Sequence, residues 1–210
     1  MNPENFRPIT LQPVWFKIFS AVYAMKMKDI LNKNNLIEKQ IQKGFSEGLD
    51  GVTEHTELLT HMIKTAKREQ RSIVVTLLDL KSAFTSVHHN LIKHSLNYHH
   101  LPNEFVQIFC SIYKNTYISV AVGDQWIHPI SVERGLLQGD PSSPLLFNLC
   151  VNLLVQTIAQ PKMKHLGFQW GTKSHTRQRS WLQFADDAAV IAPDTKTAQI
   201  LLRLFETWCT

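Results

Sequence analysis

Two adjacent acids, Asp186 and Asp187, stand between two short apolar runs of this 210-residue chain. The runs, 181–185 and 188–192, have the length of strands joined by a tight turn, so the pattern predicts a hairpin with the acids at its tip. Like charges side by side repel each other, and a divalent cation is a usual means of neutralising them. Oxygen ligands without thiolate or imidazole favour Mg²⁺. For an isolated acid pair, an acidic surface turn is the alternative.

Composition narrows the class of protein. A hydrophobic content of 44% and a charged content of 19% are those of a globular chain with a full core. The net charge of +5 permits a polyanionic partner but does not require one. The three cysteines are far apart and form no Cys-x-x-Cys pair, which argues against a disulfide framework or a thiolate zinc site. The apolar segments are interrupted and the first residues lack a signal-peptide pattern, so we expect no membrane role.

A third acid, Asp79, follows the apolar, β-branched run 73–78. A run of this kind predicts a strand that is buried on both faces. Because a strand would fix the position of the carboxylate, Asp79 is a better candidate ligand than an acid in a loop.

The segment 134–144 is rich in glycine and proline and predicts a loop that opens a long helix. Ser143 is expected at the N-cap and Pro144 at the first helical position, with the helix ending before Pro161. The helix is expected to pack through leucines and to expose polar residues to solvent or to a nucleic-acid strand. The leucines are Leu145, Leu149 and Leu153, and the polar residues are Asn148, Asn152 and Gln156.

Other segments have simpler patterns. Helices are predicted over 14–31 and over 56–70, the second with Thr53 as its N-cap. Strands over 117–122 and 126–132 are expected to form a hairpin, and 162–180 is expected to be an exposed hairpin or loop.

An acid after a strand, a glycine-rich loop and an Asp-Asp hairpin, in this order, are typical of a polymerase palm. There, carboxylates from separate segments must hold two metal ions. The sequence resembles the reverse transcriptases of retrotransposons without long terminal repeats, the non-LTR or LINE type. Five ordered segments carry this resemblance: 5–9, 42–45, 78–84, 135–148 and 184–187.

The resemblance implies an α+β fold with the fingers and palm of a right-hand polymerase, in which helices back an antiparallel palm sheet. Residues 1–72 would form the fingers region and residues 73–210 the palm, with a fingers-like insertion at about 88–130. The thumb would be absent, so we expect a C-terminally truncated part of a longer polyprotein with thumb, endonuclease and DNA-binding regions.

The resemblance also implies an RNA-directed DNA polymerase, a nucleotidyltransferase that copies an RNA template by adding dNTPs to a DNA primer. Asp79, Asp186 and Asp187 would be the catalytic acids. With the backbone carbonyl of Leu80, they would hold two Mg²⁺ ions, for which Mn²⁺ is a possible substitute. The implied location is intracellular, and nuclear during integration.

Substrate-binding roles follow from the same resemblance. Phe84 would be the steric gate that stacks under the deoxyribose and excludes a 2′-hydroxyl. Gln138 and Gly139 would approach the incoming nucleotide and the template. Arg7 belongs to the fingers segment that tracks RNA.

Two alternatives stay open. An RNA-dependent RNA polymerase typically has glycine before Asp-Asp and a polar residue at the gate, so Ala185 and Phe84 argue against it. The other alternative is an inactive, truncated remnant that only binds nucleic acid through a basic face, against which the three intact acids argue. For a template channel, basic residues near Arg7, Lys43 and Arg134 are predicted to face a common groove.

Overall fold

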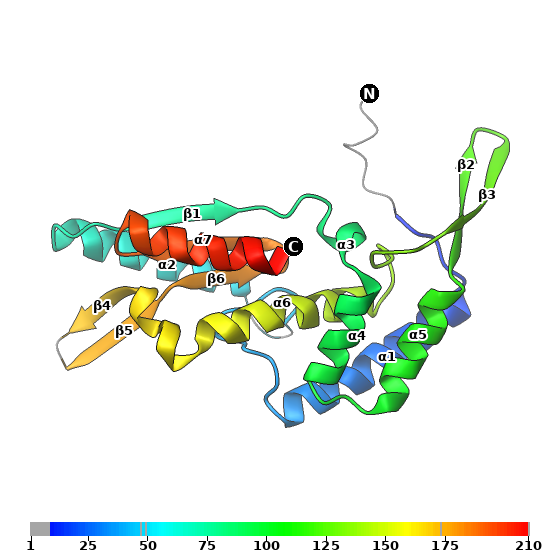
Figure 1. The fold of residues 1–210 in the computed structure, drawn as a ribbon, viewed down its shortest axis with the longest axis horizontal. Coiled ribbons are helices and arrows are strands. Elements are labelled where there is room, and N and C mark those ends of the chain that lie inside the picture. The colour runs from blue at the N-terminus through cyan, green and yellow to red at the C-terminus, as the bar shows by residue number, and fades with distance from the viewer. Residues whose placement is uncertain (1–8, 47, 49, 173, 210) are drawn as a thin grey trace. The chain divides into compact units, whose positions relative to one another are not determined.

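The computed structural model describes residues 9–46, 48, 50–172 and 174–209. Two compact units make up this part of the chain, and each is assembled from two separate stretches of sequence (Figure 1). The first unit contains residues 9–36 and 82–150, and the second contains residues 37–81 and 151–209. The division into fingers at 1–72 and palm at 73–210 stays a prediction.

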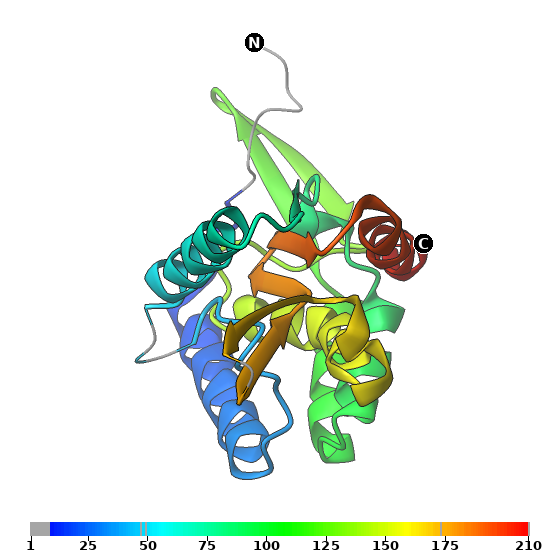
Figure 2. The ribbon, with the colours of Figure 1, turned by 90° about the vertical axis from the view of Figure 1, so that its left-hand side faces the viewer.

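A three-stranded antiparallel sheet forms the centre of the second unit (Figure 2). Its strands, in spatial order, are β1 (Val74–Leu78), β7 (Asp187–Ala192) and β6 (Trp181–Phe184). A two-residue turn joins β6 to β7, with Phe184 opposite Asp187. The hairpin that the sequence predicts is therefore confirmed.

Helices pack on both faces of this sheet, because alternate residues of a strand point to opposite sides. On one face, α2 (Gly51–Arg68) closes a buried apolar cluster. On the other face, the fully buried Trp181 packs against Phe205 of α7 (Thr195–Cys209), with ring centroids 5.8 Å apart. The cluster under α2 consists of Met62, Ala66, Phe168, Trp170, Leu182, Ala189 and Ile191.

The predicted burial of β1 on both faces is wrong. Leu77 is 77% exposed, although it lies in an apolar strand. The reason is position: β1 pairs only with β7, at one edge of this sheet, and the buried cluster under α2 takes its strand residues from β4, β6 and β7. A strand at an edge can be as apolar as a central strand and still face solvent.

The first unit is mainly helical. Tyr23 is buried in α1, and its hydroxyl donates a hydrogen bond to the carbonyl of Phe105 in α5 at 2.8 Å. The predicted helix over 14–31 and the predicted hairpin over 117–132 are both confirmed. The elements are α1 (Val14–Lys33), α3 (Ala83–Ser86), α4 (His89–Tyr98), α5 (Asn103–Lys114), β2 (Tyr117–Val122) and β3 (Gln125–Ser131).

Helix α6 (Ser143–Ala159) starts in the first unit and ends in the second. It ends before Pro161, as predicted, but its expected solvent-facing polar stripe is wrong. Asn148 and Asn152 are buried, and the Asn152 side-chain oxygen accepts a hydrogen bond from the backbone N–H of Glu38 at 3.1 Å. A buried amide here supplies an acceptor that a distant segment needs. Within the described chain, we find no helix with both the length and the apolarity of a membrane span.

Two segments also differ from expectation, one in where its helix begins and the other in its burial. Helix α2 begins at Gly51 rather than Thr56, because the Asp50 carboxylate caps it by accepting the N–H of Thr53 at 3.3 Å. The expected exposed segment 162–180 does contain a hairpin, β4 (Phe168–Thr172) with β5 (His175–Arg179), after a 3₁₀ helix at Pro161–Leu166. Its aromatic residues are buried, however, and belong to the cluster under α2.

Candidate functional site

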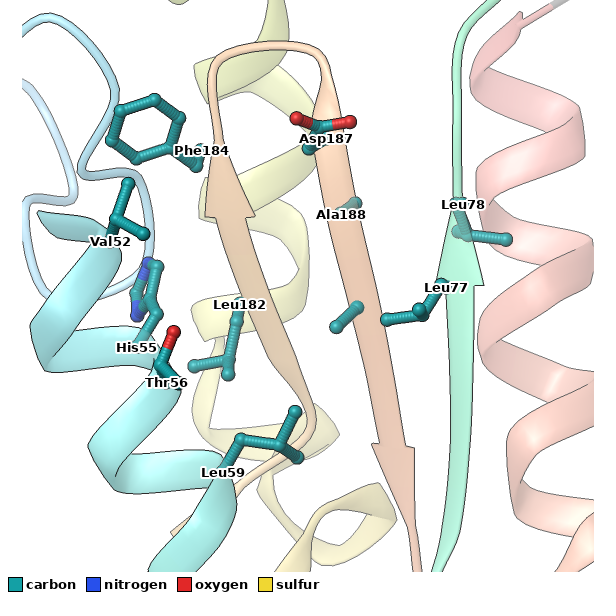
Figure 3. Close-up of a pocket in the computed structure, with 11 residues that line it drawn as sticks. Val52, His55, Thr56, Leu59, Leu77, Leu78, Leu182, Phe184, Asp187 and Ala188 are labelled. Atoms are coloured by element: carbon teal, nitrogen blue, oxygen red, sulfur yellow. The ribbon is translucent and has the colours of Figure 1, made fainter.

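Three acids occupy the end of the central sheet at which β6 turns into β7. Asp187 is the first residue of β7, Asp186 is the second residue of the turn, and Asp79 directly follows β1. Because Leu78 lies opposite Ala188, β1 ends level with the turn end of β7, and Asp79 follows β1 at that end of the sheet. Figure 3 shows the Asp187 carboxylate at the turn end of β7. Asp79 and Asp187 are exposed and Asp186 is half-buried, so a substrate can reach all three.

The donor chemistry of this sheet end suits a hard cation. The three acids offer carboxylate oxygens and Leu80 offers a carbonyl, and these are the ligand types that Mg²⁺ takes in proteins. In the described part of the chain, no three His, Cys, Asp or Glu side chains are grouped closely enough to hold a metal ion. The assignment of Asp79, Leu80, Asp186 and Asp187 as ligands stays a prediction.

A cavity of about 330 Å³ lies between α2 and the turn end of the sheet (Figure 3). Its walls are mostly apolar, and the acid Asp187 and the base His55 are among the exceptions. The sequence pattern does not predict this cavity, because three separate stretches of chain form its walls. The lining residues are Val52, His55, Thr56, Leu59, Leu77, Leu78, Leu182, Phe184, Asp187, Ala188 and Ala189.

His55 joins α2 to the segment before it and to β6. Its Nε2 lies 3.0 Å from the carbonyl oxygen of Ile41 and 3.1 Å from that of Gln183. Both partners are acceptors, so Nε2 carries the proton. Burial lowers the pKa of His55, and the positive charges of Lys43 and Arg179 lower it further, although the two backbone hydrogen bonds oppose the shift. The folded state therefore favours neutral His55.

We expect the free energy of unfolding to decrease as the pH falls from 7 towards 5. An unfolded histidine titrates near its ordinary pKa of about 6.5, and folded His55 titrates lower, so between the two values the unfolded chain binds more protons. The stabilisation is complete above the unfolded value and is lost as the pH falls towards the folded one. Urea unfolding at pH 5, 6 and 7 measures the slope. His55→Gln should flatten it, whereas the matched change at exposed His61 should not.

The glycine-rich loop of the first unit is fixed by a buried acid. Asp140 is only 5% exposed, and one of its carboxylate oxygens accepts the N–H and the hydroxyl of Ser142 and the hydroxyl of Ser20. Its other oxygen accepts a hydrogen bond from Gln12 at 3.0 Å. These neutral donors tie the loop to the first helix of the unit and to the residues before it, so the loop is preorganised.

Gln138 and Gly139 lie in this loop beside a hollow of about 730 Å³, which Gln138, Arg134 and Thr85 help to line. The carbonyl of Gln138 accepts the N–H of Thr10 at 2.8 Å. Gly139 has a φ of 104°, a conformation that favours glycine. The hollow is large enough for a nucleotide-sized group, and its wall carries one negative and one positive side chain, Glu133 and Arg134.

Phe84 is held next to the same loop. Its ring stacks on that of Phe147, with centroids 4.7 Å apart and planes inclined by 14°. Its carbonyl accepts the N–H of Leu136 at 2.7 Å. A Cβ at Gly135 would lie 2.6 Å from the carbonyl oxygen of Thr85, so only glycine permits this approach of the loop. The ring is therefore rigidly supported and half-buried.

The chain matches the protein family described as reverse transcriptase (RNA-dependent DNA polymerase) over residues 2–210. It belongs to the reverse transcriptase family. The domain is 31% identical over 209 residues to the retrovirus-related Pol polyprotein from the type-1 retrotransposable element R2 of Nasonia vitripennis, covering 98% of this chain and 19% of that protein. It is 28% identical over 202 residues to the corresponding polyprotein of element R2DM from Drosophila melanogaster, covering 96% of this chain and 18% of the relative. This reverse transcriptase domain thus spans about a fifth of these relatives.

Solved telomerase structures share the fold of this reverse transcriptase domain. Telomerase from Candida tropicalis in complex with a fragment of telomeric RNA superposes with a TM-score of 0.62 at 12% identity, over 90% of this chain and 32% of that one. The apo enzyme, truncated from its C-terminal domain, gives 0.59 at 13% identity, over 92% and 38%. The predicted resemblance and the predicted α+β fold of fingers and palm are confirmed.

The predicted site residues of this reverse transcriptase domain fall in two regions of the described structure. Asp79, Asp186 and Asp187 share one sheet end of the second unit, whereas Phe84, Gln138 and Gly139 share one loop region of the first. Arg7 lies outside the described residues. Sequence reasoning missed Gln42 and His55 as residues with roles at the acidic hairpin. The segment 42–45 gave a signal for Gln42, but no pattern in the sequence singled out His55.

Proposed function

We propose that this domain acts as the RNA-directed DNA polymerase of a retroelement. The observation that carries the proposal is the pairing of Leu78 with Ala188, because Asp79 directly follows the first of these residues and Asp187 directly precedes the second. In the reaction, the primer 3′-oxygen forms a bond to the α-phosphorus of a dNTP, the bond to pyrophosphate breaks, and the hydroxyl proton passes to solvent. When bound, two Mg²⁺ ions, or Mn²⁺ in their place, would activate the hydroxyl and neutralise the pyrophosphate.

The candidate site residues would have separate roles in this reaction. Asp79, Asp186 and Asp187, with the carbonyl of Leu80, would hold the ions and thereby orient the reacting groups. Phe84 would stack under the sugar, and the Gln138-Gly139 loop would bind the base pair that forms. Arg7 would contact the RNA template. These roles come from the resemblance, and the carboxylate donor set and the preorganised loop support them.

The names of the similar proteins support a wider proposal. The R2 relatives are Pol polyproteins, so we propose that the domain works within a longer polyprotein. From the family resemblance we further propose that this polyprotein has thumb, endonuclease and DNA-binding regions and works in the nucleus during integration. The similar telomerase is in complex with a fragment of telomeric RNA, which supports RNA as a partner. An RNA template is proposed from the family resemblance. The primer is proposed to be DNA.

Primer extension on poly(rA)/oligo(dT) with the full-length protein tests this function. We expect Mg²⁺-dependent addition of dTTP and little addition of UTP. Equal or preferred use of UTP would favour an RNA-dependent RNA polymerase instead. Retained binding of the duplex without any extension would identify an inactive remnant that only binds nucleic acid.

Binding of an RNA/DNA duplex should weaken steeply with salt. If about four basic side chains contact phosphates, affinity falls roughly a hundredfold between 50 and 200 mM salt, because bound counterions are released on association. Fluorescence anisotropy measures this slope. Arg134→Ala should reduce the slope of log affinity against log salt concentration by about one, because one phosphate contact is lost. Lys196→Ala, on the exposed part of α7, should not change the slope. Lys43 is a weaker candidate, because it forms an ion pair with Glu54.

A further inference from the structure

The turn that carries Asp186 contains a residue in an unfavourable backbone conformation. Ala185 has a φ of 53°, in the left-handed region that favours glycine. It is 3% exposed, so water does not reach its backbone easily. Such a residue keeps its conformation only where the surrounding structure holds it. Because Asp186 follows Ala185 directly, the groups that hold the backbone of Ala185 also set the direction of Asp186.

The side-chain amide of Gln42 brackets the backbone of Ala185. Its Oε1 accepts the N–H of Ala185 at 3.0 Å, and its Nε2 donates to the carbonyl of Ala185 at 3.4 Å. The same Oε1 accepts the N–H of Gly44 at 2.8 Å, which fixes which end of the amide is oxygen. Gln42 is 1% exposed, so these hydrogen bonds are made away from solvent.

Neighbouring groups hold the bracket in place. The segment around Gln42 runs parallel to β6, with Gln183 N–H donating to Ile41 and Lys43 N–H donating to Gln183, each at 3.0 Å. Gln183 adds a second donor to the carbonyl of Ala185 at 2.8 Å, and its own amide is oriented by the indole N–H of Trp181. A Cβ at residue 44 would lie 2.3 Å from the nitrogen of Ala185, which explains the glycine at this position.

We propose that Gln42 is a positioning residue for catalysis: its amide holds Ala185 in the left-handed conformation and so places Asp186 for the reaction. This inference rests on the proposed polymerase function and extends it to a residue that does not touch the substrate. Gln42 acts through its hydrogen bonds to two backbone groups of Ala185. If it only filled space, a side chain of the same volume without hydrogen bonds would serve equally well.

Gln42→Met separates hydrogen bonding from packing, because methionine has a similar volume and cannot bracket a peptide unit. In primer extension with the full-length protein, kcat should fall at least about tenfold, while KM for the dNTP changes less than about threefold. The matched control is Gln40→Met, two residues earlier, where the side chain is exposed. This control should keep the parental kcat.

A second substitution tests whether the conformation of Ala185 is what Gln42 supports. Glycine adopts a positive φ without strain. Adding Ala185→Gly to Gln42→Met should therefore give a kcat at least about threefold higher than that of Gln42→Met alone. This double variant also serves if Gln42→Met alone is too unstable to purify. Parental kcat in Gln42→Met, or a loss that Ala185→Gly does not reduce, would overturn the proposal.

Amide hydrogen exchange tests the hydrogen bonds between Gln42 and Ala185 independently of primer extension. In the parental protein the N–H of Ala185 should exchange slowly, and Gln42→Met, alone or with Ala185→Gly, should accelerate exchange at residue 185 at least about tenfold. Unchanged exchange there would overturn the bracket itself. Failure of the proposed function shows differently: the parental full-length protein would then not extend primers with dTTP, whatever the exchange rate at residue 185.

Discussion

Replacing Asp187 with asparagine should lower the rate of primer extension by at least about a thousandfold. Asparagine keeps the size of the side chain but removes the charge that a divalent ion needs, and the corresponding loss of transition-state stabilisation is at least about 4 kcal/mol. Asp79→Asn should have an effect of the same order if the two acids hold the same ions, since the ends of β1 and β7 that carry them are paired through Leu78 and Ala188. Single-nucleotide incorporation under single-turnover conditions measures the rate.

The control for this prediction is Asp124→Asn, at an exposed position in the turn between β2 and β3. It removes an equal charge from the same protein and should leave the rate within about twofold of the parent, as surface changes usually do. Melting temperatures should stay close to the parental value in all three variants. An Asp187→Asn variant that is folded and retains more than a tenth of the rate would exclude this acid from the proposed metal site.

Reducing the ring of Phe84 should relax sugar selection. If the ring lies under the deoxyribose, Phe84→Val opens space for a 2′-hydroxyl, and the ratio of ribonucleotide to deoxynucleotide incorporation should rise about a hundredfold. Deoxynucleotide incorporation should survive, because discrimination by a steric clash requires no hydrogen bond. The ratio of kcat/KM for UTP and dTTP is the measurement.

Phe84→Tyr is the matched control, since it keeps the flat ring and should keep the discrimination. The stacking of Phe84 on Phe147 means that the valine change also costs packing energy, about 1 to 3 kcal/mol, so stability must be measured beside selectivity. A valine variant that is less stable yet equally selective would show that Phe84 serves packing only.

Local patterns predicted the elements that depend on neighbours in sequence. The hairpin 181–192, the helix over 14–31 and the end of α6 before Pro161 all follow from strand length, helical periodicity and a chain breaker. Asp79 was also identified correctly as an acid that follows a strand. The convergence of Asp79 with Asp187 stays a prediction, and the register of β1 with β7 supports it by bringing the end of β1 level with the turn end of β7.

Features that depend on distant partners could not be read from local patterns. Leu77 is apolar and exposed because β1 lies at a sheet edge, which its own composition does not reveal. Asn152 is polar and fully buried because the backbone N–H of Glu38, 114 positions earlier, needs an acceptor. The cavity near His55 and the amide of Gln42 against Ala185 belong to the same class. Each needs two or three segments to be folded together first.

Two of the hairpin turns of this domain, the one between β2 and β3 and the one between β6 and β7, differ in how freely evolution can change their length. At the turn between β2 and β3, Gly123 has a positive φ, and a side chain added there would meet open space, so an inserted residue can bulge into solvent. The turn at Ala185 has no such freedom, since its peptide groups are enclosed by Gln42 and Gln183. One extra residue there would invert the inward and outward sides of β7 and turn Val190 away from its packed side. Among descendants of this sequence, insertions and deletions should therefore occur at the turn between β2 and β3 and be absent from the turn at Ala185.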